Sequence, residues 1–194
     1  MTTPFDIKLA SSSPRRREIL AALRLEFSVV AVDVDETPLV DEAAREMVVR
    51  LAVAKAEAAD AGLRDIVIAA ATAVVVDGRI LGKPEHREDC LAMLEALAGR
   101  CHQVFTGVAL HRGDTTRTAV SGTDVYFREI GRDEALAYWQ SGEPRDKAGG
   151  YAIQGLGGVF VERIEGSYSG VVGLPVFETA ALLRQAGFDL VTRQ

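Results

Sequence analysis

The amino-acid sequence predicts an α/β protein whose mixed sheet is flanked by helices. Segments rich in β-branched residues alternate along the chain with segments whose apolar residues recur three and four positions apart, the period of a helix. This alternation is typical of parallel strands joined by helices. Turn signals such as Asp77-Gly78 also predict hairpins, which pair strands in antiparallel fashion. A sheet that contains both kinds of pairing is therefore expected.

The first half of the chain holds two predicted helices among predicted strands. We expect a strand at 7–10, a helix at 15–25, a helix at 41–59, a strand at 66–70 and a hairpin over 72–81. Ser13 is the expected N-cap of the first helix and Pro14 its first residue, because proline lacks the N–H group that would be unpaired there. In the second helix, Met47, Leu51 and Lys55 recur four residues apart, which predicts one buried face.

The second half continues the alternation with longer β-rich stretches. We expect a helix at 87–97, β-rich stretches at 101–111 and 115–130, a helix at 132–140, a strand at 159–164 and a closing helix at 175–186. Arg112-Gly113-Asp114 separates the two β-rich stretches and predicts a second hairpin, because glycine tolerates positive φ. Residues 1–194 contain no internal repeat or low-complexity linker, so one domain is expected.

Composition and charge exclude several classes of protein. With 48% hydrophobic residues, the 194-residue chain can bury a sizeable core. Its formal net charge of −6 argues against nucleic acid and membrane surfaces as partners, because both are polyanions that attract basic proteins. Its two cysteines lack the spacing of a disulfide framework or a zinc site. No apolar segment has the length of a membrane span, so we expect a soluble, cytoplasmic protein.

The stretch LASSSPRR at 9–16 gives the strongest local signal of a functional site. Hydroxyl groups, backbone N–H groups left unpaired at a helix start, and two guanidinium groups converge here. A helix N-terminus attracts anions, and arginine can bind two phosphate oxygens at once. The predicted anion site consists of Ser11, Ser13, Arg15 and Arg16. The alternative is a serine-capped helix whose arginines are merely solvated.

Two lysines and one acidic loop are further candidates. Lys55 lies in the buried-face register of the second helix, and Lys83 lies between glycine and proline after the first hairpin. Either lysine could neutralise phosphate charge, or it could be a surface lysine whose stem covers apolar area. Asp33, Asp35 and Glu36 form a loop whose oxygens could hold a divalent cation, although a solvated turn explains their position equally simply.

The glycine-rich stretch from 148 to 158 contains Gln154, whose side-chain amide could face a base edge. Packing within a turn is the alternative explanation. His86, His102 and His111 are too scattered to form a metal site, and each is expected to be structural or solvated.

Several separated motifs together resemble the Maf family of nucleotide pyrophosphatases over nearly the whole chain. They are LASSSPRR at 9–16, Arg50-Leu51-Ala52 and Lys55-Ala56 on one helix, LGKP at 81–84, HQV at 102–104, DKAGGYAIQG at 146–155, GSY at 166–168 and VGLP at 172–175. Their number and order make a chance match implausible.

The resemblance implies an elongated fold similar to that of inosine triphosphate pyrophosphatases, with the substrate in a cleft between two lobes, and a homodimer. The reaction it implies cleaves a nucleoside triphosphate into monophosphate and pyrophosphate with Mg²⁺ or Mn²⁺. Lys55 and Lys83 would assist catalysis by stabilising phosphate charge, and Glu36 would support the metal. The combination of Arg16, Thr72 and Gln154 is similar to the branch that acts on dTTP, UTP and modified pyrimidine nucleotides.

One departure from the family pattern concerns catalysis. Where the family has Gly-Ala-Asp-Thr, this chain has Ala69-Ala70-Ala71-Thr72. The family's aspartate is thought to activate water, whereas a methyl group can neither accept a proton nor hold a cation. Ala71 thus predicts an impaired enzyme, such as a substrate-trapping form. The alternative from a different class is a nucleotide-binding regulator without turnover, for example of cell division.

Overall fold

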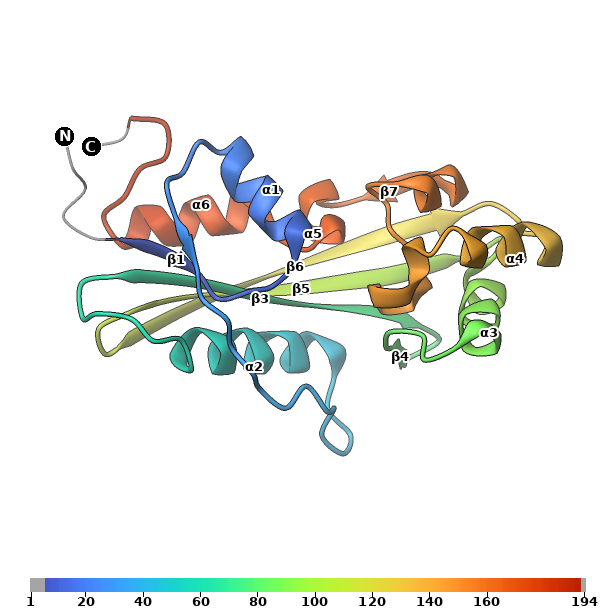
Figure 1. The fold of residues 1–194 in the computed structure, drawn as a ribbon, viewed down its shortest axis with the longest axis horizontal. Helices are drawn as coiled ribbons and strands as arrows, with labels where there is room; N and C mark the ends of the chain where they lie inside the picture. The colour runs from blue at the N-terminus through green and yellow to red at the C-terminus, as the bar shows by residue number, and fades with distance from the viewer. Residues whose placement is uncertain (1–5, 193–194) are drawn as a thin grey trace. The chain divides into compact units, whose positions relative to one another are not determined.

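The computed structural model describes residues 6–192 and contains a seven-stranded mixed sheet. The strand order is β2-β1-β3-β5-β6-β7, and β4 pairs with β3 (Figure 1). The strands are β1 Ile7–Leu9, β2 Ser28–Val29, β3 Ile66–Val76, β4 Arg79–Leu81, β5 Cys101–Arg112, β6 Thr115–Phe127 and β7 Val161–Glu165. The helices are α1 Pro14–Ala22, α2 Ala44–Glu57, α3 Arg87–Leu97, α4 Arg132–Gln140, α5 Tyr168–Val172 and α6 Val176–Gln185.

The described residues form two compact units. The first unit comprises the described residues up to Ala71, Thr106–Ser121, and the described residues from Gly173 onward. The second unit comprises Thr72–Phe105 and Gly122–Val172. Every helix in the described part of the chain is too short or too polar to cross a lipid bilayer.

The first unit packs helices on both faces of its part of the sheet. Helices α1 and α6 cover one face and α2 covers the other (Figure 1). Strand residues alternate between these faces, so Ile66 and Ile68 join the core beneath α1 and α6, whereas Val67 and Ala69 pack towards α2. Strand β1 pairs in parallel with both β2 and β3, which confirms the parallel part of the prediction.

Close packing of α2 on β5 depends on a glycine. A Cβ atom at Gly107 would lie 2.4 Å from the backbone oxygen of Val48. Any side chain there would therefore force the helix away from the strand.

The second unit contains α3, α4, α5, β4 and β7. Its core joins the α3 residues Leu94 and Leu97 to Phe127, Tyr138 and Phe160. Strands β3 and β4 are antiparallel, as are β6 and β7, so the predicted mixed sheet is confirmed. The first predicted hairpin is also confirmed, because Asp77 and Gly78 both have positive φ, the conformation that a tight hairpin turn requires.

Four sequence predictions need correction. The predicted break between 70 and 72 is wrong, because the buried alanines around Thr72 allow one continuous strand from Ile66 to Val76. Helix α2 begins at Ala44, three residues later than expected, after a turn at 40–41. Strand β7 begins at Val161 because Leu156–Phe160 forms a 3₁₀ helix. The short elements β2 and α5 were not predicted, since two and five residues give too little periodicity.

Candidate functional site

The β1–α1 loop places a buried serine at the start of the first helix. Ser11 Oγ accepts hydrogen bonds from the Ser13 backbone N–H at 3.3 Å and from Arg16 Nη1 at 3.1 Å. Ser13 occupies the N-cap position and Pro14 follows as the first helical residue, as predicted, but the Ser13 side chain makes no capping hydrogen bond. Ser11 is therefore the serine that orders this loop.

Arg16 is the best-positioned guanidinium of the predicted anion site. Its Nε donates to the Gly173 backbone oxygen at 2.8 Å, and its Nη1 donates to Ser11. Burial lowers the pKa of Arg16 to about 10, Glu36 opposes this shift and the neighbouring Arg15 adds to it. Arg16 thus remains a cation at neutral pH, and both of these acceptors are uncharged oxygens. They orient its guanidinium group.

Lys55 lies on the buried face of α2, in its last turn, with only 8% of its surface exposed. Its Nζ forms an ion pair with Glu36 Oε1 at 2.7 Å, and the Glu36 side chain itself is 53% exposed. The alternative of a solvated surface lysine is therefore wrong for Lys55. An ion-pair partner offsets part of the cost of burying an ammonium group, so Glu36 helps to hold Lys55 inside the first unit.

The loop that carries Glu36 is fastened to α2 by an arginine. Arg50 Nε and Nη2 donate to the two carboxylate oxygens of Glu42 at 2.5 and 2.6 Å, and Nη2 also reaches the Thr37 backbone oxygen at 3.2 Å. Hydrogen bonds from Arg50 are the main reason that the pKa of Glu42 falls to about 2. Asp35 accepts from the Thr37 backbone N–H at 2.9 Å, so for Asp35 the turn explanation holds.

Ala71 is buried in β3, with 3% of its surface exposed. Because side chains alternate along a strand, Ala71 shares the sheet face of Val67 and Ala69, which is the face that α2 covers. Lys55 projects from α2. A longer side chain at position 71 would therefore point into the layer between β3 and α2.

The described residues suit a divalent cation only in a limited way. Among residues 6–192, no group of three His, Cys, Asp or Glu side chains has the arrangement of a metal site. Mg²⁺ is, however, commonly held by one or two carboxylates together with substrate phosphates. Glu36 is exposed on its loop and binds Lys55 through one carboxylate oxygen, so it fits the role of a single carboxylate ligand that shares a cation with phosphates.

The first unit therefore brings together part of the predicted site. Its members there are Ser11, Arg16, Glu36 and Lys55, linked in sequence by hydrogen bonds, electrostatic attraction and an ion pair. Three other candidates belong to the second unit. Lys83 is exposed after the β3–β4 hairpin, Thr72 is half-buried in β3, and Gln154 is exposed in the glycine-rich stretch.

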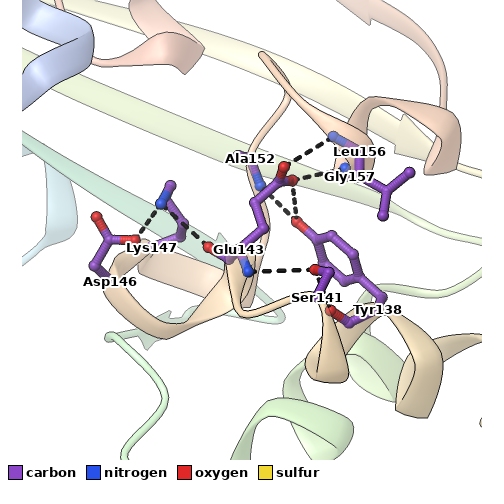
Figure 2. Close-up of polar contacts among 8 residues, drawn as sticks. All are labelled: Tyr138, Ser141, Glu143, Asp146, Lys147, Ala152, Leu156 and Gly157. Carbon is purple, nitrogen blue, oxygen red and sulfur yellow. Dashed lines mark hydrogen bonds and ion pairs between the residues drawn. The ribbon is translucent and has the colours of Figure 1, made fainter.

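The second unit contains a hydrogen-bonded network that sequence reasoning missed, and Figure 2 shows it around Glu143. Glu143 Oε1 accepts from the Tyr138 hydroxyl at 2.7 Å and from the Gly157 N–H at 2.9 Å, while Oε2 accepts from the Leu156 N–H at 2.9 Å. The Tyr138 hydroxyl also accepts from the Ala152 N–H at 3.1 Å. The only feature of the sequence that could have indicated this network is Glu143-Pro144, in a segment without helical or strand periodicity.

A buried histidine on β5, His102, contacts Tyr151 in the glycine-rich stretch. His102 Nε2 lies 2.8 Å from the Tyr151 hydroxyl, and both rings pack edge-on against Phe127. Burial lowers the pKa of His102 to about 4, so the ring is neutral at pH 7. The prediction that His102 is structural is consistent with this core position.

Comparisons with known proteins extend over most of the chain. Residues 6–186 match the family described as Maf-like protein. The chain is 50% identical over 184 residues to a dTTP/UTP pyrophosphatase of Methylobacillus flagellatus, a match that covers 93% of this chain and 92% of the relative. It is 47% identical over 187 residues to a dTTP/UTP pyrophosphatase of Vibrio parahaemolyticus, covering 95% of this chain and 99% of that relative.

Solved structures show weaker likeness. A Ham1 protein of Staphylococcus aureus has a TM-score of 0.44 and 19% identity, over 63% of this chain and 71% of that one. A nucleoside-triphosphatase, or dITP/XTP pyrophosphatase, of Mycobacterium abscessus has a TM-score of 0.41 and 14% identity, over 93% of this chain and 95% of that one.

Proposed function

This chain belongs to the family of Maf-like proteins, and from that premise we propose that it binds dTTP and UTP and hydrolyses them to the monophosphate and pyrophosphate. The relatives named dTTP/UTP pyrophosphatase, which align along nearly their whole length, support the choice of substrate. The observation that carries the proposal is the arrangement of Ser11, Arg16 and Lys55 in the first unit. It provides for a highly charged anion a guanidinium group, a hydroxyl group and an ammonium group that is ion-paired with Glu36.

The chemistry requires neutralisation of phosphate charge. Water attacks the α-phosphorus and gives up a proton to a base or to solvent, the α–β anhydride bond breaks, and pyrophosphate leaves with the bonding electrons. Arg16 would bind phosphate oxygens through its oriented guanidinium, and Lys55 and Lys83 would stabilise charge that develops on the leaving group. When bound, Mg²⁺ or Mn²⁺ would supply further neutralisation, and Glu36 is the residue that we propose contacts it.

Ala71 limits this activity in our proposal. The methyl group at this buried position cannot take a proton from the attacking water. The charged groups that would bind the triphosphate are nevertheless retained. The chain would therefore bind its substrate well and turn it over slowly. The same observation favours a second candidate function, a nucleotide-binding regulator that performs no turnover.

Nucleotide titration calorimetry and release of pyrophosphate test the proposal. We expect UTP and dTTP to bind more tightly than ATP and GTP. Lys55→Met and Lys83→Met should each weaken UTP binding. Lys8→Met is a matched control, because Lys8 forms an ion pair with Asp65 at 3.0 Å in the first unit and is not a site candidate. Equal affinity for all four nucleotides would refute the proposed specificity, and unchanged affinity in both site variants would place the triphosphate elsewhere.

We also propose that the protein is cytoplasmic and a homodimer. The charge and cysteine content of the sequence support the first statement, and resemblance to the family supports the second. Sedimentation of the purified chain would distinguish a dimer from a monomer.

A further inference from the structure

The segment from Ala152 to Gly157 carries the proposed base-reading residue and is held at both ends. Gln154 is exposed at its middle, while Ala152 and Gly157 are buried. Residues 151–155 belong to no helix or strand, so regular hydrogen bonding does not fix their conformation. The side chains that bind the two ends of the segment therefore contribute to the position of Gln154.

Glu143 holds the C-terminal end of the segment. Its carboxylate accepts the consecutive backbone N–H groups of Leu156 and Gly157, both at 2.9 Å (Figure 2). The approach is close, because a Cβ atom at Gly155 would lie 2.4 Å from Glu143 Oε2. Burial raises the pKa of Glu143, but hydrogen bonds from Gly157, Tyr138 and Leu156 outweigh it, so the net pKa is lowered and the group stays ionised. Hydrogen bonds to an ionised acceptor are stronger than neutral ones.

Tyr138 holds the N-terminal end of the same segment. Its hydroxyl accepts the Ala152 N–H and donates to Glu143, which joins the two ends through one pair of side chains. Burial and the bond to Glu143 raise the pKa of Tyr138 above its usual range, so the hydroxyl keeps its proton. Its ring packs edge-on against Phe160, with centroids 5.0 Å apart. Tyr138 is thus a rigid anchor.

We propose that Tyr138 and Glu143 are positioning residues that fix Gln154 for recognition of the uracil or thymine edge, and that this pair determines the preference for UTP over CTP. The inference rests on the proposed function, since it assumes that Gln154 faces the base. The relatives are named for dTTP and UTP, whose bases share the same O4 and N3–H groups. Cytosine has the same ring size but an amine and a bare nitrogen at these positions.

Fixed placement matters because an amide can satisfy either base. A glutamine side chain has one acceptor oxygen and two N–H donors, so rotation by half a turn would exchange the groups it presents to uracil and cytosine. Discrimination therefore requires that its position and orientation be restricted before the base arrives. The clamp on both sides of Gln154 restricts the backbone, and so the place from which its side chain reaches the base.

The test uses the purified chain with Tyr138→Phe and Glu143→Gln. Phenylalanine keeps the packing on Phe160 but removes the hydroxyl group. Glutamine keeps the size of Glu143, but its amide N–H group would face donors, namely the Tyr138 hydroxyl or the backbone N–H groups of Leu156 and Gly157. Matched controls are Tyr126→Phe on β6 and Glu134→Gln on α4, where Glu134 accepts from Arg128 Nη1 at 2.9 Å. Tyr126 packs against Arg163 and Glu134 pairs with Arg128, so each control removes a polar group whose partner lies outside the clamped segment.

Calorimetry should measure the dissociation constants for UTP and CTP. We expect UTP to bind about tenfold more weakly in both variants, which corresponds to the loss of one well-placed hydrogen bond. The dissociation constant for CTP should change by less than about twofold. Amide hydrogen exchange supplies a second readout. Exchange at Leu156 and Gly157 should accelerate about tenfold in Glu143→Gln, and both controls should match the wild type.

The outcomes separate the two levels of the proposal. An unchanged UTP-to-CTP ratio in both variants, or unchanged exchange at Leu156 and Gly157, overturns the positioning role while the proposed function stands. Equal weakening of UTP and CTP also overturns it, because a merely structural role affects both nucleotides alike. A wild-type chain that does not prefer UTP over CTP overturns the assumed base recognition and this inference with it.

Discussion

Replacing Ala71 with aspartate should restore turnover. General acid–base catalysis by one positioned group contributes about 10²–10⁴-fold in rate. We therefore expect Ala71→Asp to release pyrophosphate from UTP or dTTP at least about a hundredfold faster than the chain itself. Position 71 lies on the sheet face that α2 covers, and α2 carries Lys55. A cation nearby lowers the pKa of a carboxyl group.

The same substitution should reduce stability. Ala71 is only 3% exposed, so the added carboxylate must fit into a packed layer. Insertion of extra atoms into a packed core costs about 1–3 kcal/mol. In a protein of this size, each kcal/mol corresponds to a fall in Tm of about 2–4 °C. Thermal unfolding followed by circular dichroism should show this fall.

An isosteric control separates chemistry from packing. Ala71→Asn has nearly the same shape as aspartate but cannot act as a base, so we expect it to lose stability without gaining activity. Pyrophosphate release should be measured for all three forms at saturating UTP with added Mg²⁺. Equal rates for alanine and aspartate would refute our role for this position and favour the regulator. Equal gains for asparagine and aspartate would refute proton transfer.

Further predictions concern charge, pH and packing. Lys55→Met should weaken UTP binding about tenfold or more, because it removes a buried cation and leaves Glu36 to repel phosphate. An unchanged dissociation constant for UTP would contradict this. Without magnesium, the chain should bind UTP at least as tightly as the Ala71→Asp variant does, because the added carboxylate repels phosphate. Calorimetry with and without magnesium measures both affinities. If aspartate tightens binding only when magnesium is present, the carboxylate chiefly recruits metal, which refutes this prediction. Burial lowers the pKa of His102 from 6.5 to about 4, so its contribution to stability is complete above pH 6.5 and about 3 kcal/mol is lost as pH falls to 4. Urea unfolding at pH 7 and pH 4.5 should show a smaller pH effect in His102→Gln, and equal effects would contradict the argument. Gly107→Ala should destabilise the protein by about 1–3 kcal/mol, because its Cβ would lie 2.4 Å from a backbone oxygen of α2, and an unchanged unfolding midpoint would contradict this.

Periodicity predicted the larger elements because each has enough residues to repeat its pattern. Helix α3 at Arg87–Leu97 and helix α4 at Arg132–Gln140 have the predicted bounds. The turn at Asp77-Gly78 was predictable because its geometry depends on those two residues. The register of Lys55 on a buried helix face was equally local, since it follows from the spacing of residues within one helix.

The sequence by itself determined the mixed α/β class, and it predicted the candidate phosphate-binding residues and the role of position 71, because these depend on residue type and on spacing along the chain. Only the tertiary structure decided which of these residues are partners. It paired Lys55 with Glu36 and Ser11 with Arg16. It also joined Tyr138 and Glu143 around the segment that carries Gln154. The physical reason is that such contacts join residues far apart in the chain, and their geometry is fixed by the packing of whole elements and not by local pattern.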